Sequence, residues 1–172
     1  MSKLYLVGID PGKNGGIARA FSEKGKVLWT SFSTMSMSED VGEIYDFIRK
    51  PIDNRVRTII GLEQLGGFIM GASGASLFKL GAQYGKVKAI AELLASMSSS
   101  VSVKLIPPQK WQAETTSLKR RDFPSENKWK SHLKMRACTW LDDNKITKEK
   151  PTLKTADAIL ILRYLHLLHC PE

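Results

Sequence analysis

The chain has 172 residues, of which 42% are hydrophobic and 25% charged, a balance typical of one globular domain and not of a disordered or fibrous chain. Lys and Arg outnumber Asp and Glu by 26 to 17, and this basic excess favours a polyanionic partner. The longest apolar stretch, residues 156–170, is interrupted by charged residues and falls short of the ~18 apolar residues of a membrane span.

We therefore expect residues 1–172 to form a single domain that is not inserted in a membrane. No internal repeat, low-complexity tract or long linker marks a second domain. Cys138 and Cys170 lie far apart and outside any CxxC pair, which argues against a zinc site or a disulfide framework. With no apparent signal peptide, the expected location is the cytoplasm.

The first part of the chain predicts an antiparallel meander of three strands. Residues 3–10, about 15–21 and 26–33 are extended segments rich in β-branched, leucine and aromatic residues. Residues 22–25 are the predicted hairpin turn between the last two segments. These three strands are expected to pair in chain order.

Helices and strands alternate in the rest of the chain. Ser36 and Glu39 have the spacing of a capping box and predict a helix that Pro51 ends. A buried strand over 57–63 and a long helix over 74–97 follow.

The last part of the chain begins with a fifth strand over 101–106, which Pro107 and Pro108 end. A basic, irregular stretch then leads to helices from about 125 to 143 and from about 155 to 169. This order predicts an α/β fold with a mixed five-stranded sheet, three strands antiparallel and two parallel, flanked by helices.

Three carboxylates lie where predicted elements begin or end. Asp10 ends the first strand, Glu63 ends the fourth, and Asp157 begins the last helix. If the first and fourth strands are parallel neighbours, Asp10 and Glu63 lie side by side at the carboxyl edge of the sheet, where ligands bind in open α/β sheets. Asp10 is equally explained as a turn residue and Asp157 as a favourable charge at a helix start.

A buried cluster of like charges is costly unless a cation neutralises it. Hard carboxylate oxygens suit Mg²⁺, with Mn²⁺ as a substitute. Two such ions ~3.5–4 Å apart can activate a water for attack on phosphorus and stabilise the leaving oxygen. The carboxylates therefore indicate a metal-dependent nuclease.

A basic segment accompanies these carboxylates. Residues 104–136 contain nine basic and three acidic side chains, with Trp111, Phe123 and Trp129 among them. The segment is interpreted either as a footprint on a phosphate backbone or as a solvated surface with core aromatics. No nucleotide cofactor is expected, because residues 8–13 have three and not four residues between the glycines of a Walker A loop.

Several separated motifs resemble the RuvC-type Holliday-junction resolvases of the ribonuclease H-like superfamily. They are Gly8-Ile9-Asp10-Pro11-Gly12 with Gly15-Gly16-Ile17-Ala18, Leu62-Glu63-Gln64, the helix start at residues 75–85, and Ala156-Asp157-Ala158-Ile159-Leu160. The resemblance implies a ribonuclease H-like core, a homodimer, and Mg²⁺-dependent paired nicking of four-way DNA that leaves 5′-phosphate and 3′-hydroxyl ends.

The resemblance also implies roles for individual residues. Asp10, Glu63 and Asp157 would be the metal ligands, and Lys110 and Lys128 would assist at the scissile phosphate. Further basic residues are expected to hold the DNA arms: Lys119, Arg120, Arg121, Lys130 and Lys134. Phe68 is the candidate for an aromatic wedge that opens the junction.

One position departs from the family pattern. Many relatives have an acidic residue one turn before the last aspartate, whereas this chain has Lys154. That change leaves open a junction-binding protein with impaired catalysis. A second alternative is a phosphotransferase of the actin-like and sugar-kinase type, whose first strand also ends in a DxG pattern.

Overall fold

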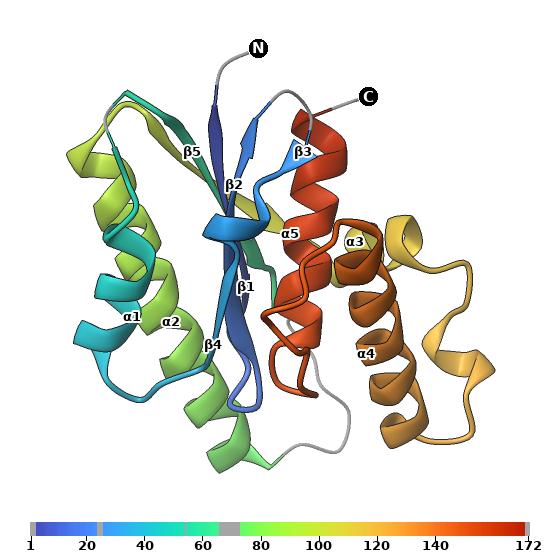
Figure 1. The fold of residues 1–172 in the computed structure, drawn as a ribbon. Helices are drawn as coiled ribbons and strands as arrows, with labels where there is room; N and C mark the ends of the chain where they lie inside the picture. The colour runs from blue at the N-terminus through green and yellow to red at the C-terminus, as the bar shows by residue number, and fades with distance from the viewer. Residues whose placement is uncertain (1–2, 24–25, 54, 66–72, 171–172) are drawn as a thin grey trace.

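The computed structural model describes residues 3–23, 26–53, 55–65 and 73–170. A central sheet is covered by helices on both faces (Figure 1). The strands are β1 (Leu4–Asp10), β2 (Gly16–Glu23), β3 (Lys26–Val27), β4 (Ser33–Ser36), β5 (Arg57–Glu63) and β6 (Val101–Ile106). The helices are α1 (Val41–Arg49), α2 (Gly74–Met97), α3 (Pro108–Thr115), α4 (Glu126–Asp143) and α5 (Ala156–His169), with short 3₁₀ turns at Trp29–Ser31 and Arg120–Asp122.

The sheet is mixed, as the order of the elements predicts. Its strands follow the order β3-β2-β1-β5-β6, and β4 also pairs with β2. β1 is antiparallel to β2 and parallel to β5, and β5 is parallel to β6. The expected pairing of the first and fourth predicted strands, which are β1 and β5, is thus confirmed.

Burial on both faces of the sheet explains why β1 carries no charged residue before Asp10. Leu4 and Leu6 pack in a core with α4 and α5, whereas Tyr5, Val7 and Ile9 pack in a second core with α1 and α2. Successive side chains of a strand point to opposite faces, so a strand covered on both sides reads as a continuous apolar run. Figure 1 shows α1 and α2 on one face and α3, α4 and α5 on the other.

The third predicted strand is two separate strands, so the sheet has six strands and not five. The extended segment expected over 26–33 is broken by the turn at Trp29–Ser31. The hydroxyl of Ser31 accepts a hydrogen bond from the Phe21 amide (2.9 Å) and donates one to the Leu28 carbonyl (2.7 Å). A side chain therefore replaces the sheet hydrogen bonds at this point. Two of the predicted turn residues, 24 and 25, lie outside the described residues.

The predicted capping box is also wrong, although the helix itself is confirmed. Ser36 pairs with Gly16 in the sheet, and the N-cap of α1 is Asp40, whose carboxylate accepts hydrogen bonds from the amides of Gly42 and Glu43 (2.6 and 3.3 Å). A serine that pairs in a strand cannot cap a helix that begins five residues later.

The stretch after the two prolines is a helix, α3, where an irregular segment was expected. Pro108 occupies the first turn of α3. Proline is tolerated there, because the amide it lacks would have no partner within the helix. The other predicted elements are confirmed, including α4 with its N-cap at Ser125 and α5 after Thr155. In the described part of the chain no helix is both long and apolar enough to cross a membrane.

Helix α5 lies directly against β1 because Gly8 has no side chain. A Cβ at Gly8 would come within 2.3 Å of the Ala158 carbonyl oxygen and 2.5 Å of the Leu162 amide nitrogen. Both atoms belong to the backbone of α5, which would have to move away from the sheet. Gly8 thereby fixes the distance between β1, which carries Asp10, and α5, which carries Asp157.

We predict that Gly8→Ala lowers the free energy of unfolding by about 3 kcal/mol, the upper part of the range for overpacking a tight site. The matched control is Gly74→Ala, where an added Cβ meets nothing within 4 Å and the change is expected to stay below about 1 kcal/mol. Urea denaturation monitored by circular dichroism measures both. Equal stability of the two variants would contradict the close packing of α5 on β1.

Candidate active site

The sheet register brings Asp10 and Glu63 together. Ile9 pairs with Leu62 in the parallel ladder of β1 and β5, so the next residues, Asp10 and Glu63, end the two strands at the same edge. Asp157 lies in the first turn of α5, which packs on β1. Asp10 and Asp157 are 9% and 4% exposed. The three carboxylates that the sequence singles out therefore form one cluster.

The backbone around Asp10 is shaped to hold its carboxylate. Oδ1 of Asp10 accepts a hydrogen bond from the Gly12 amide (2.9 Å). A Cβ at Gly15 would lie 2.7 Å from the carboxyl carbon of Asp10, so the turn needs glycine there. Desolvation nevertheless raises the pKa of Asp10 against the opposing effects of the Gly12 hydrogen bond and of Lys130.

Glu63 is a strongly perturbed carboxyl of the cluster. Burial, followed by repulsion from Asp10 and Asp157, raises its pKa to about 8. Lys130 and the indole of Trp111 act in the opposite direction. Trp111 is fully buried on α3, and its Nε1 has no partner with hydrogen-bond geometry. The site thus holds more negative charge than its protein surroundings stabilise.

Asp157 forms an ion pair with Lys130 of α4. Its Oδ2 accepts the hydrogen bond from Nζ, whereas its Oδ1 is buried without a hydrogen-bond partner. Burial raises the pKa of Asp157 to about 6 even though Lys130 lowers it. One lysine therefore compensates only part of the charge of the cluster.

Lys130 is an integral part of this site. Burial lowers the pKa of its ammonium group, but attraction to Asp157, Asp10 and Glu63 more than offsets that effect and raises it. The side chain of Lys130 is 36% exposed, against 6% for Asp157. Its ammonium group lies on the solvent side of a desolvated acidic cluster and acts as its counter-ion.

The donor set has the chemistry of a site for Mg²⁺ or Mn²⁺. Carboxylate oxygens are the ligands that these hard cations prefer, and the unpartnered Oδ1 of Asp157 and the raised pKa values of the cluster indicate a missing positive charge. In their present positions, however, no three His, Cys, Asp or Glu side chains of the described residues converge closely enough to hold a metal ion. A bound ion would need small side-chain movements, including that of Lys130 away from Asp157.

Lys110 and Lys128, the lysines predicted to act at the scissile phosphate, are exposed. Lys110 lies in α3, one residue before the buried Trp111, and Lys128 lies in the first turn of α4. The lysine that contacts the carboxylates is Lys130, two residues after Lys128, which the sequence placed in the DNA-binding set. Phe68, the predicted wedge, lies outside the described residues.

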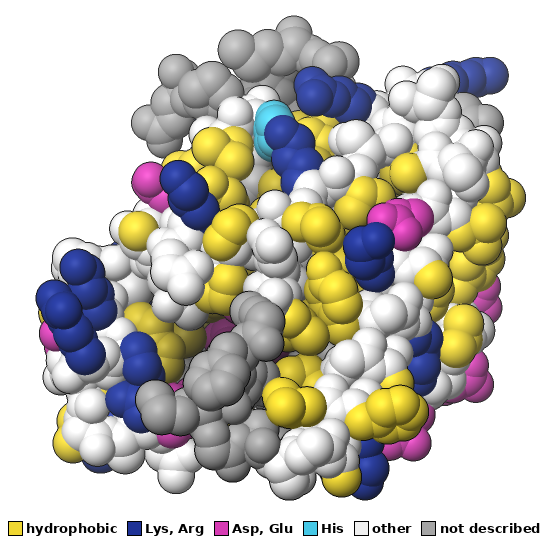
Figure 2. All heavy atoms as spheres, turned by 180° about the vertical axis from the view of Figure 1, so that it is seen from behind, with side chains coloured by type: hydrophobic (Ala, Val, Ile, Leu, Met, Phe, Trp, Pro, Cys, Tyr) yellow, Lys and Arg dark blue, Asp and Glu magenta, His cyan; other side chains and the backbone are white. Residues whose placement is uncertain are grey.

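The other predicted DNA-binding residues lie at the edge formed by α4 and the segment before it. Lys119, Arg120 and Arg121 are exposed, and Lys134 is half-buried. Figure 2 shows basic side chains gathered at this edge of the molecule. Arg120 is partly engaged within the protein, because its Nε pairs with Glu126 at 2.7 Å. This edge keeps the basic character that the sequence indicates.

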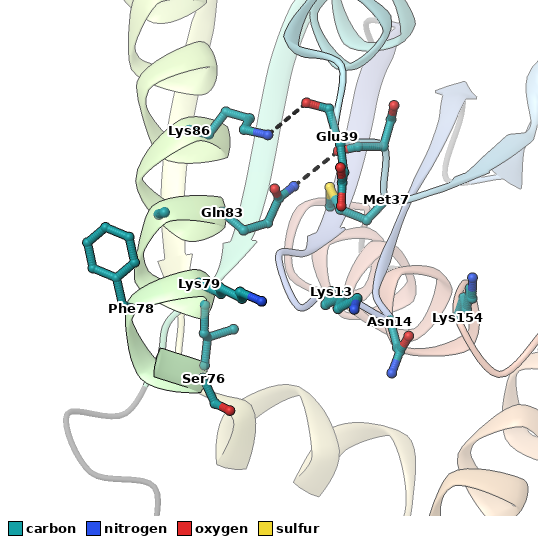
Figure 3. A pocket seen from close by; sticks show the side chains of 13 residues that line it. Lys13, Asn14, Met37, Glu39, Ser76, Phe78, Lys79, Gln83, Lys86 and Lys154 are labelled. Atoms are coloured by element: carbon teal, nitrogen blue, oxygen red, sulfur yellow. Dashed lines mark hydrogen bonds between the residues drawn. The ribbon is translucent and has the colours of Figure 1, made fainter. Parts of the chain in front are cut away.

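Lys154 faces a groove that the sequence does not reveal. The groove is lined by Lys13 and Asn14 of the β1–β2 turn, residues 37–39 before α1, the first half of α2, and Lys154 (Figure 3). We call it the lysine groove, because four of its lining residues are lysines, namely Lys13, Lys79, Lys86 and Lys154. These lysines come from three separate segments, so sequence spacing alone gave no sign of the groove.

Comparison with known proteins identifies the fold. No protein family matches the sequence, and no curated protein sequence matches it. The structure is similar to RuvC of Thermus thermophilus in complex with a Holliday junction substrate, with a TM-score of 0.58, 18% sequence identity, and coverage of 94% of this chain and 91% of that chain. It is also similar to a second Thermus thermophilus RuvC structure, with a TM-score of 0.56, 16% identity, and coverage of 96% and 95%. The chain therefore has the α/β fold of RuvC over nearly its whole length.

Proposed function

We propose that this protein is a metal-dependent endonuclease that cuts four-way DNA junctions by paired nicks, leaving 5′-phosphate and 3′-hydroxyl ends. The observation that carries the proposal is the cluster of Asp10, Glu63 and Asp157, desolvated at the carboxyl edge of the sheet. The RuvC fold and the basic edge along α4 support a branched nucleic acid as the substrate.

Asp10, Glu63 and Asp157 would hold the divalent ion. When bound, such an ion activates water and stabilises charge on phosphate oxygens. The protein contributes the positions of the three carboxylates, each of which is carried by a different element: β1, β5 or α5. Lys110 and Lys128 extend from α3 and α4 into solvent, and we assign them to the scissile phosphate, where an ammonium group stabilises developing charge.

A junction-binding protein without nuclease activity is the second candidate. Two observations favour it: Lys154 stands where relatives often have an acid, and Lys130 is paired with Asp157. Both reduce the negative charge available to metal ions. The two candidates make the same prediction for DNA binding and opposite predictions for cleavage.

We predict that the wild-type protein nicks a synthetic four-way junction in Mg²⁺ or Mn²⁺, and that Asp10→Asn abolishes nicking, because the amide removes one anionic ligand of the ion. The measurement is denaturing gel electrophoresis of end-labelled junction, with EDTA and a linear duplex of the same sequence as controls. Native gels on the same samples report binding separately.

Paired nicks confined to the junction would establish the nuclease. Junction binding without nicks in either metal would select the binding protein, and Lys154→Asp would then be expected to raise cleavage. Absence of both binding and cleavage would overturn both candidates.

We predict that Lys130→Met lowers the stability of the metal-free protein and enlarges its stabilisation by metal. Removing one partner of a buried ion pair costs ~3–5 kcal/mol, and partial exposure of Lys130 reduces this to about 1–3 kcal/mol. Without the ammonium group, a divalent ion meets no competing charge. Thermal unfolding in EDTA and in millimolar Mn²⁺ measures both effects.

Lys134→Met is the matched control, since Lys134 lies one turn further along α4 and outside the cluster. The Mn²⁺-induced rise in Tm is expected to be larger in Lys130→Met than in either the control or the wild type. An equal rise in all three proteins would show that Lys130 does not compete with the ion.

We propose further that two copies of the chain associate through α2. One side of α2 exposes residues at the spacing of neighbours on a helix face, which are Phe78, Gly81, Gly85, Ala89 and Leu93. Phe78 is 78% and Leu93 52% exposed, and added Cβ atoms at Gly81 and Gly85 meet nothing within 4 Å. Small residues between exposed apolar ones allow a second helix to approach closely, and a two-fold pair would present two active sites to the symmetric arms of a junction.

We predict that Leu93→Lys converts the dimer to a folded monomer, because a lysine within the contact would be buried without a partner. Light scattering coupled to size-exclusion chromatography gives the mass. The control is Met135→Lys, at a similarly exposed position on α4 (54%), which is expected to leave the mass unchanged. A monomeric wild type at micromolar concentration would refute the dimer.

A further inference from the structure

The lysine groove has a volume of about 890 Å³, and two of its lysines belong to the segments that carry Asp10 and Asp157. Lys13 follows Asp10 by three residues, and Lys154 precedes Asp157 by three residues. The opposite wall is the first half of α2, from which Lys79 extends across the groove toward Lys13 (Figure 3). Two sides of the groove are therefore formed within three residues of Asp10 and Asp157.

The lining of the groove is strongly basic. Four lysines and one glutamate, Glu39, line it. Among the described residues, Lys13, Lys79 and Lys154 form no ion pair, whereas Lys86 donates a hydrogen bond to the backbone carbonyl of Glu39 at 2.8 Å. Three ammonium groups thus line the groove without a carboxylate partner. An anionic ligand would provide the missing negative charge.

Both polar and apolar side chains complete the lining. Four uncharged polar residues accompany the lysines, namely Asn14, Ser38, Ser76 and Gln83, and the apolar lining comes from Met37, Phe78, Leu80 and Ala82. Sites for small drug-like molecules and cofactors are mostly apolar and enclosed. An open groove of lysines, amides and hydroxyl groups instead suits a phosphate backbone, which contacts its protein mainly through such groups.

The groove and the basic edge along α4 lie on different sides of the carboxylate cluster. The edge belongs to α4 and the segment before it, on one face of the sheet, whereas the groove is walled by α2 and residues 37–39 on the other side (Figures 1 and 3). A nucleic-acid strand that crosses the carboxylates meets positive charge before and after the reacting phosphate.

We propose that the lysine groove binds the DNA backbone on the side of the cleaved bond opposite the α4 edge, with Lys13, Lys79 and Lys154 each contacting a phosphate. This inference rests on the proposed function and adds a second contact surface to it. It also gives Lys154 a role: at this position the chain has a phosphate-binding group in place of an acid. The groove would hold the substrate strand in line over Asp10 and Asp157.

Binding of a four-way junction in EDTA tests the groove without cleavage. The test variant replaces Lys13, Lys79 and Lys154 by Gln, and the matched control replaces Lys26, Lys50 and Arg55, three exposed basic residues outside the groove, also by Gln. Each lost phosphate contact reduces the slope of log K against log salt by about 0.9. We expect the slope of the test variant to be shallower by about 2–3 and that of the control to be unchanged.

Neutral methylphosphonates at single positions then locate the contacts. Placed on the groove side of the cleavage position, they are expected to weaken binding by the wild type and to have no further effect on the test variant. Inorganic phosphate is then titrated up to about 10 mM, on the order of cellular concentrations. We expect it not to compete with the junction, because a DNA backbone in the groove binds through several linked phosphates together.

The outcomes separate this inference from the proposed function. A wild type that does not bind the junction would overturn both. A wild type that binds it, with equal slopes for the test variant and the control, would overturn the groove alone and leave the nuclease proposal intact. Strong competition by inorganic phosphate would show that the groove is a site for a small anion. That result would likewise overturn the proposal that the groove binds the DNA backbone.

Discussion

Desolvation of three like charges is the constraint on which the candidate site depends. Asp10, Glu63 and Asp157 come from three different elements and share one region with little solvent. Their raised pKa values show that the protein leaves this charge incompletely compensated. Lys130 supplies one positive charge, and the remaining deficit is what a divalent ion would fill. A structure that tolerates this cost must be held rigidly by the packing around it.

That rigidity comes from the close contacts beneath the cluster. β1 is buried on both faces, and its neighbours β2 and β5 are joined to it along nearly their whole length. Gly8 lets α5 approach the strand, and Gly15 leaves room for the carboxylate of Asp10. Close-packed interiors resist displacement, so the cluster does not relax by moving its members apart.

The sequence predicts well those features that depend on local patterns or on parallel pairing. Asp10 and Glu63 each follow an apolar strand, and the adjacency of these strands is sufficient to place both carboxylates at one edge. The sequence fails where one residue has two possible uses. Ser36 lies in a helix-capping pattern yet pairs in the sheet, and the hydroxyl of Ser31 takes the place of a backbone hydrogen-bond partner. Pro108, which was expected only to end a strand, also begins helix α3. Lys130 and the lysine groove depend on the packing of distant segments, which local spacing does not encode.

The sheet also acts as a partition within the molecule. The core on the α1–α2 side and the core on the α4–α5 side have no residue in common. Effects of substitutions at distant sites without shared partners add nearly independently. The exposed face of α2 can therefore vary during evolution while Asp157 and its support on α5 stay unchanged. Surface on one side of the sheet and the packing around Asp157 on the other side can change separately.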